Sequence, residues 1–370
     1  MNLEQKLSVA NEQLRNGDLQ RAMGSLADLF GEVIDEPRSR MRLLEWVVER
    51  VAHPDPEFGA HIAVVGGALV EHGASANYLG RALMEPVLQS LVNAKRLLDR
   101  AATLPDEPGE DTLEVGDRHL SRATVEAFAA EDVDALNAWL SLSTWYRPAV
   151  AAWARQPSLL RELQATAAFR AALAAIGSAT ETSHWLSLLI ETVFDARFVV
   201  LIPELREVWS VDAHGVVDMG QLTVLLSEAL AEPLARLGAS EVASPAVLDV
   251  MRGIGPQEGE GSYPSTFAFY QAASIDPASG LPQDGKHTYV APGGTGDHSL
   301  PADFLPGTIA QHDGARLLVM VGPNGPGLRF VRVIPAVRTF DPLRAHVDRI
   351  RKIDEPDAAA WIARAHAIAT

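Results

Sequence analysis

The sequence predicts a mainly α-helical protein, in which an N-terminal array of antiparallel helices is followed by an α+β domain with a small antiparallel sheet. Three observations favour this fold class. Apolar residues recur every three or four positions through most of the first half, which is the period of a helix face. After residue 196, short β-branched runs appear between turn residues. At 370 residues, the chain is also long enough to form more than one domain.

The first helices are each predicted from a single apolar face. On the first helix this face is made by Leu3, Leu7, Ala10 and Leu14. Gly17 ends that helix, and Asp18 is placed to cap the next one. This pair resembles one helical hairpin of the tetratricopeptide (TPR) type. No fixed period recurs along the chain, so we predict an irregular array in the style of TPR or HEAT repeats.

Composition shifts divide the chain into four predicted segments. These are a helical array at 1–103, an acidic linker rich in proline and glycine at 104–116, a central helical segment at 117–195, and an α+β domain at 196–370 with long Gly/Pro-rich loops and C-terminal helices. Helices are expected at 117–130 and 133–155. The second of these carries the aromatic residues Trp139, Trp145, Tyr146 and Trp153. These side chains suit a ligand pocket or a partner surface, but we favour packing between the helical and α+β parts.

The second half shows strand patterns. Residues 197–202 and 207–211 read as a β-hairpin, and residues 315–321 as a strand that pairs with 328–334. A single helix is expected at 219–237, a strand at 266–274, a loop at 253–265, and closing helices at 342–353 and 355–368.

Composition also limits the classes of function. A formal net charge of −17 argues against nucleic acid and anionic membranes as partners, because both attract basic surfaces. The absence of cysteine excludes disulfides, thiolate catalysis and thiolate metal sites. The N-terminus lacks a signal-peptide pattern, and no apolar run reaches the length of about 18 residues that spans a bilayer. We therefore expect a soluble, acidic, cytoplasmic protein.

No recognised catalytic or nucleotide-binding motif occurs, and no pattern identifies a cofactor. The candidate ligand-binding residues lie in one His/Asp-rich stretch at 284–313 and are His287, His298, Asp303, His312 and Asp313. Imidazole with carboxylate suits Zn²⁺, a non-haem iron site or general acid–base chemistry. The alternative is that these residues only cap backbone groups in a long loop, and this alternative matches the absence of a metal-ligand spacing.

Two further features bear on binding. His61, Gly66, Gly67 and His72 lie on one predicted helix and form a candidate interaction surface. We favour helix packing for the paired glycines, because glycine weakens a helix unless another backbone approaches closely. A basic region at 329–352 suits an anionic ligand, although neutralisation of acidic groups within the chain is the simpler interpretation.

The leading hypothesis from sequence is a non-catalytic interaction or adaptor protein that presents a helical surface to a protein partner or to a second copy of itself. The competing hypothesis is an enzyme, or a protein that binds a small ligand or a metal, with its site in the 284–313 loop.

Overall fold

The computed structural model describes residues 2–177, 179–237, 243–254, 260–265, 268–271, 305–321, 328–332 and 340–369. The chain divides into two compact units, Met1–Ile190 (unit 1) and Glu191–Thr370 (unit 2). Unit 1 is an array of helices with one short β-hairpin, and unit 2 combines a sheet with helices. The predicted fold class is therefore confirmed.

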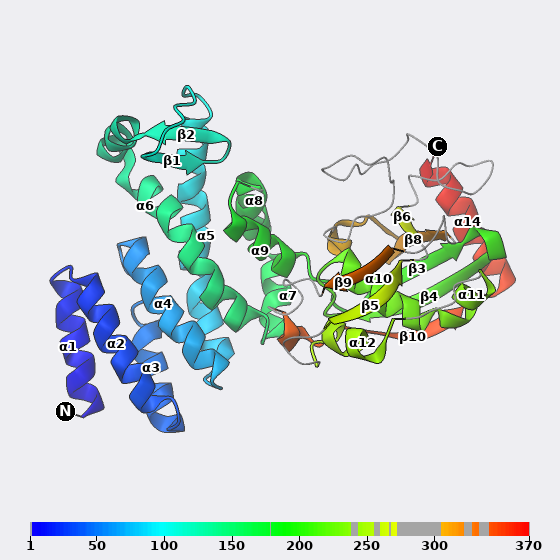
Figure 1. The fold of residues 1–370 in the computed structure, drawn as a ribbon, viewed down its shortest axis with the longest axis horizontal. Helices are drawn as coiled ribbons and strands as arrows, with labels where there is room; N and C mark the ends of the chain where they lie inside the picture. The colour runs from blue at the N-terminus through cyan, green and yellow to red at the C-terminus, as the bar shows by residue number, and fades with distance from the viewer. Residues whose placement is uncertain are drawn as a thin grey trace. The chain divides into compact units, whose positions relative to one another are not determined.

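The elements of unit 1 follow one another as α1 (Leu3–Arg15), α2 (Leu19–Val33), α3 (Pro37–Val48), α4 (Pro56–Glu71), α5 (Ala76–Ala101), β1 (Thr112–Val115), β2 (Arg118–Ser121), α6 (Arg122–Trp153), α7 (Pro157–Ala165), α8 (Ala167–Ile176) and α9 (Glu181–Ile190). Short turns join α1 to α2 and α4 to α5. Consecutive helices therefore run in opposite directions, and the long helices α5 and α6 lie side by side (Figure 1).

Polar side chains fix where several helices begin. The Asp18 carboxylate accepts a hydrogen bond from the Arg21 backbone N–H (3.1 Å) at the start of α2, as predicted. Within α6, the Asp132 carboxylate accepts a bond from the Ala135 backbone N–H (3.2 Å), and the backbone of Asp132 is not helical. Helix α6 is thus two helices joined at Asp132, in agreement with the predicted break between residues 130 and 133.

Helix α4 is the centre of unit 1. Apolar side chains and glycines lie all around it, and α2, α3, α5 and α6 all contact it. A Cβ atom on Gly66 would lie 2.9 Å from Cδ1 of Leu79, and one on Gly67 would lie 2.9 Å from Cα of Pro148. Glycine is therefore required at Gly67, where the neighbouring atom belongs to backbone, whereas a side chain at Gly66 would require a shift of the Leu79 side chain.

The aromatic residues of α6 belong to the core of unit 1. Trp139, Trp145 and Trp153 are buried there. The Trp139 indole donates to the carbonyl of Glu114 in β1 (3.2 Å), and the Trp153 indole donates to the carbonyl of Gly80 in α5 (2.9 Å). The expectation that these tryptophans fill an interface with the α+β part is therefore wrong, because they tie α6 to elements of its own unit.

Residues 104–116, which we expected to act as a linker, contribute a strand to unit 1. β1 pairs antiparallel with β2, so Leu113 lies opposite Leu120. The backbone N–H of Glu107 donates to the carbonyl of His119 (2.9 Å), which holds the preceding acidic segment against the hairpin. The helix expected from residue 117 begins at Arg122 instead, where Ser121 caps it.

The elements of unit 2 are β3 (Ala196–Ile202), the 3₁₀ turn η1 (Pro203–Leu205), β4 (Glu207–His214), α10 (Met219–Ala229), α11 (Ala231–Arg236), α12 (Pro245–Met251), β5 (Glu260–Ser265), β6 (Ala268–Gln271), η3 (Pro306–Thr308), β7 (Gln311–His312), β8 (Ala315–Val321), β9 (Leu328–Arg332), η4 (Asp341–Leu343), β10 (His346–Lys352) and α14 (Glu355–Ala369). Strand β5 occupies part of the predicted loop at 253–265, and the helix expected at 219–237 is two helices that meet at Leu230.

The main sheet of unit 2 is mixed, in the order β10–β4–β3–β8–β6, with β7 also paired to β8. The predicted hairpin of β3 and β4 is confirmed, and its register places Val199 opposite Ser210. The predicted pairing of β8 with β9 is wrong. Strand β8 instead pairs parallel with β3, and β9 pairs with β5 in a separate two-stranded sheet.

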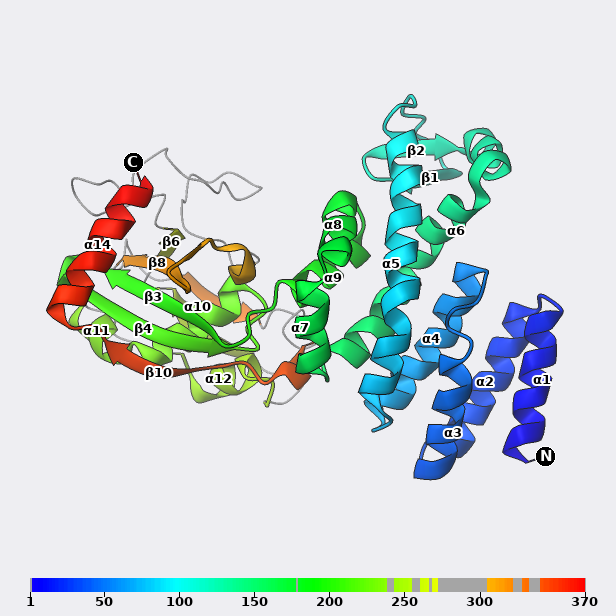
Figure 2. The same ribbon diagram turned by 180° about the vertical axis from the view of Figure 1, so that it is seen from behind.

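Helices lie on both faces of the main sheet (Figures 1 and 2), and an apolar core lies between helix and sheet on each face. On one face, Phe198 and Val200 of β3 pack with residues of α10, α11 and α12. On the other face, Val199 and Leu201 pack with Ala358 and neighbouring residues of α14. β3 is therefore buried on both sides, which explains its unbroken apolar sequence.

The prediction of a helix at 342–353 is wrong, because this segment forms a 3₁₀ turn followed by strand β10. Among the described strands, β10 pairs only with β4, at one end of the strand order. Its register shifts between Asp348 and Arg351, and Arg349 there adopts a positive φ of 48°. Charges and a bulge are typical of an edge strand, since both hinder pairing with another chain.

Within the part of the chain that the structure describes, no helix combines the length and the apolar character needed to cross a bilayer.

We predict opposite effects for alanine at two helical glycines. Gly67→Ala places a methyl group against the backbone of Pro148 and should lower the free energy of unfolding by about 1–3 kcal/mol. Gly24→Ala is the matched control in α2, because a Cβ there meets nothing within 4 Å, and it should stabilise by about 0.5–1 kcal/mol. Denaturant unfolding followed by circular dichroism measures both. Equal effects would contradict the close approach of α4 and α6.

Candidate functional site

The structure describes only the end of the predicted His/Asp-rich loop. His287, His298 and Asp303 lie outside the described residues. His312 is half-buried in β7, opposite Ala315 of β8. Asp313 follows in the turn between β7 and β8, where it adopts a positive φ of 49°, and its exposed carboxylate pairs with Arg364 of α14. His312 and Asp313 thus lie close to the C-terminal helix.

Asp313 also lines a pocket of about 420 Å³ in unit 2. The wall of this pocket is built from the start of β3, the β7–β8 turn, the end of β10 and one side of α14. Its charged and aromatic lining residues are Arg197, Asp313, Arg351, Lys352, Asp354, Asp357, Trp361 and Arg364. The volume lies within the range of about 300–1,000 Å³ that is typical of small-molecule sites.

The pocket exists because α14 covers only part of one sheet face. Arg197, Val199 and Leu201 alternate along β3 and so point to the same face. Val199 and Leu201 lie in the apolar core beneath α14, whereas Arg197 lines the pocket beside it. The sheet face thus changes from apolar to charged at the edge of the helix.

Some of the lining charges are neutralised within the chain. Arg364 pairs with Asp313, and its guanidinium lies over the Trp361 ring, 5.3 Å from the centroid. Nε of Arg197 lies 3.8 Å from the Asp212 carboxylate, which is a loose contact. Among the described residues, Arg351, Asp354 and Asp357 form no ion pair. The pocket therefore offers both a guanidinium and carboxylates to an occupant.

A buried carboxylate fixes the strand from which Arg351 projects. Glu207 at the start of β4 is only 6% exposed. Its carboxylate accepts hydrogen bonds from the Arg236 guanidinium (2.9 Å to Oε1), the Trp209 indole (3.1 Å) and the Lys352 ammonium. The bonds from Arg236 are the main cause that lowers the pKa of Glu207 from 4.5 to about 2. Glu207 thus holds α11 and the end of β10 to β4.

In the predicted basic region at 329–352, two of the four Arg and Lys residues at 344–352 are neutralised by acidic groups of the chain. Lys352 pairs with Glu207, and Arg349 lies 3.3 Å from the Asp212 carboxylate. Arg344 donates to the backbone carbonyl of Gly253. Arg351 differs from these three residues, because it faces the pocket without an acidic partner among the described residues.

The predicted interaction residues of α4 divide into two groups. Gly66 and Gly67 are buried against helices of unit 1. The imidazole Nδ1 of His61 lies 2.8 Å from the carbonyl of Glu57, and Nδ1 of His72 lies 2.9 Å from that of Ala68. The ring of His72, which is exposed, also meets that of Phe30 edge-on (5.5 Å). The two glycines therefore contact neighbouring helices and are not accessible to a partner. His61 is partly buried, and His72 is exposed at the surface.

Among the described residues, no three His, Asp or Glu side chains lie close enough together to bind one metal ion.

Comparison with known proteins found no matching family model, no matching curated protein and no matching solved structure.

The sequence showed parts of the pocket but not the pocket itself. Asp313 and the basic residues of β10 were noted for their residue types. Arg197 and Trp361 were missed, since the first stands at the start of an apolar strand and the second lies within an ordinary helical pattern. Arg197 and Val199 lie on the same face of β3, and the first is charged whereas the second is apolar. This change in residue type is the sequence signal that α14 covers Val199 but not Arg197.

We predict that Glu207 makes unfolding depend on pH. Its folded-state pKa of about 2 lies below the ordinary value of 4.5. Its contribution is therefore fully present above pH 4.5 and lost as pH falls from 4.5 toward 2, by about 3 kcal/mol. Glu207→Gln should remove this dependence and destabilise by about 3 kcal/mol at pH 7.

Urea unfolding of the full chain as a function of pH, followed by circular dichroism, checks this expectation. Glu232→Gln is the control, because Glu232 also pairs with Arg236 (2.9 Å) but is exposed, and little change is expected. An unchanged pH slope in Glu207→Gln would rule out the assigned role.

Proposed function

We propose that this chain is a binding protein whose α+β unit holds a small zwitterionic molecule, of the size and charge of a free amino acid, in the pocket beside α14. The observation that carries the proposal is the pocket lining, in which Arg351, Asp354 and Asp357 lack ion-pair partners among the described residues. No catalytic step is proposed for the site.

The chemistry of the lining selects a ligand with both charges. A guanidinium binds a carboxylate through paired hydrogen bonds, so Arg351, with Arg197 nearby in the wall, suits the anionic end. The carboxylates of Asp354 and Asp357 suit an ammonium group. The Trp361 ring, half-buried beneath Arg364, supplies the apolar part of the wall.

We predict that binding requires both charges of the ligand. Calorimetric titration of the full chain with free amino acids should show saturable binding, whereas acetate and ethylamine, which each carry one charge, should bind far more weakly. Arg351→Gln and Asp357→Asn should each weaken binding about tenfold or more, because each removes a hydrogen bond to a charged group.

Arg206→Gln is the matched control, since Arg206 is an exposed arginine of unit 2 that does not line the pocket. Its affinity should equal that of the wild type. Failure of every amino acid to bind, or wild-type affinity in both pocket variants, would exclude the proposed site.

A second candidate function is the adaptor role predicted from sequence, and exposed aliphatic side chains on α5 and α6 favour it. Arg96 bonds Asp132 (2.8 Å), and the Ser90 hydroxyl donates to the carbonyl of Ala138 (3.4 Å), so the two helices run antiparallel in a fixed register. The exposed fractions along this pair are 44% for Val92, 50% for Val133 and 49% for Leu140. Val133 and Leu140 lie seven residues apart and therefore on one face of α6, and contiguous exposed aliphatic surface is typical of protein-binding sites.

For this candidate we predict self-association through the α5–α6 surface. Light scattering after size exclusion should give a dimer mass for the wild type and a monomer mass for Leu140→Glu. Gln20→Glu adds the same charge at an exposed polar position of α2, outside the α5–α6 surface, and tests for a nonspecific effect of charge. A wild type that stays monomeric at high concentration would contradict self-association.

A further inference from the structure

Two histidines lie side by side on neighbouring strands of unit 2, at the end of the sheet. His214 ends β4, and His346 begins β10 directly opposite it in the antiparallel register. Their ring centroids are 5.1 Å apart, and the ring planes are inclined by 35°. His214 is partly exposed and His346 is exposed, so solvent reaches the pair. None of these residues lines the pocket beside α14.

The hydrogen bonds of the two imidazoles define which nitrogens are available. Nδ1 of His214 lies 3.0 Å from the Asp195 carboxylate, and Nδ1 of His346 lies 2.9 Å from the carbonyl oxygen of Arg344. Carboxylate and carbonyl oxygens only accept hydrogen bonds, so each Nδ1 carries the proton and donates it. In the neutral rings, the free lone pair is therefore on Nε2 of both histidines.

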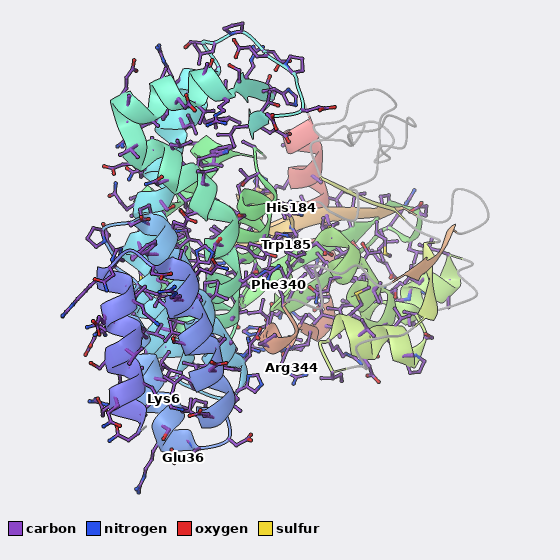
Figure 3. All side chains as sticks on the ribbon, turned by 60° about the vertical axis from the view of Figure 1, so that its left-hand side comes forward. Lys6, Glu36, His184, Trp185, Phe340 and Arg344 are labelled. Carbon is purple, nitrogen blue, oxygen red and sulfur yellow. The ribbon has the colours of Figure 1, made fainter. Side chains whose placement is uncertain are left out.

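Both acceptors are themselves held in place. Arg344 follows the turn η4, has a positive φ of 53°, and donates from its guanidinium to the carbonyl of Gly253 (Figure 3 labels Arg344). On the other side, Asp195 has a positive φ of 48°, and the ring of Phe194 before it meets the His214 ring edge-on (5.2 Å). Such outer partners are what orient the histidine ligands of metal sites.

We propose that His214 and His346 bind one divalent transition-metal ion of the Zn²⁺ type through their Nε2 atoms, with water completing the coordination. Zn–N bonds of about 2.0–2.1 Å at a tetrahedral angle place two imidazole centroids about 5 Å apart, which matches the observed 5.1 Å. Asp195 and the Arg344 carbonyl are positioning groups. Imidazole nitrogen favours Zn²⁺, Ni²⁺ and Cu²⁺ over Mg²⁺ and Ca²⁺.

The site would join the edge strand β10 to β4 at the point where their pairing begins. In this proposal the protein supplies two side chains, which is consistent with the absence of a three-residue group among the described residues. The chain contains no cysteine, so thiolates contribute no background to a zinc titration.

The test is calorimetric titration of the chelator-treated full chain with zinc chloride. The wild type should bind one Zn²⁺ at this site, and magnesium chloride should give no signal. His214→Gln and His346→Gln should each weaken zinc binding at least tenfold, and Asp195→Asn about tenfold, as expected for loss of an orienting partner. Zinc should also raise the melting temperature of the wild type but not of His346→Gln.

The control is His72→Gln, which removes an exposed histidine whose Nδ1 also lies on a backbone carbonyl but which, among the described residues, has no second imidazole beside it. This variant should bind zinc as the wild type does. The proposal is overturned if the wild type does not bind zinc, if His346→Gln keeps wild-type affinity, or if the double variant His287→Gln/His298→Gln abolishes binding instead. Each variant is first compared with the wild type by circular dichroism.

Discussion

The close approach of α4 to its neighbours is the constraint on which unit 1 depends. Most surface helices bury one face, but α4 is surrounded, and α6 can approach it closely because Gly67 presents no side chain to the backbone of Pro148. A proline at the contact is compatible with this packing, because its ring meets a bare backbone. The same arrangement recurs at Gly80 of α5, whose carbonyl receives the Trp153 indole. The sequence has no regular repeat to define how its helices pack. In this unit, contacts between small residues on one helix and large side chains on the next help to define the packing.

In unit 2, helix α14 covers only part of one face of the main sheet. The central strands β3 and β8 are apolar on both faces, whereas β10 at the edge is charged. Helix α14 packs over the apolar part of one face and leaves the charged part open, which produces the pocket. Glu207 then matters beyond stability, because its bonds to Arg236 and Lys352 fix the position of the edge strand. The histidine pair at the other end of β10 depends on the same strand pairing.

Sequence reasoning succeeded where the signal is local. Helix faces, the cap at Asp18, the break near Asp132 and the β3–β4 hairpin all follow from residues close together in the chain. It failed where the deciding contact is distant. Residues 342–353 carry apolar residues at both helical and alternating positions, and only pairing with β4 selects the strand. The partner of β8 was misassigned for the same reason, although an apolar run buried on both faces indicates a central strand rather than a hairpin arm. Of the pocket, residue type pointed to Asp313, while Arg197 and Trp361 required the packing of α14.

The parallel pairing of β3 with β8 sets the order in which the chain can complete its folds during synthesis. Unit 1 ends at Ile190 and β3 ends at Ile202, but β8 begins only at Ala315. Helices α10 to α12 emerge in between and can cover one face of the β3–β4 hairpin while the other edge of β3 still has no neighbour. Pairings between distant segments form slowly, and an unpaired apolar edge is a template for association with other chains. The apolar edge of β3 is thus left without its neighbour until the chain has been synthesised as far as β8.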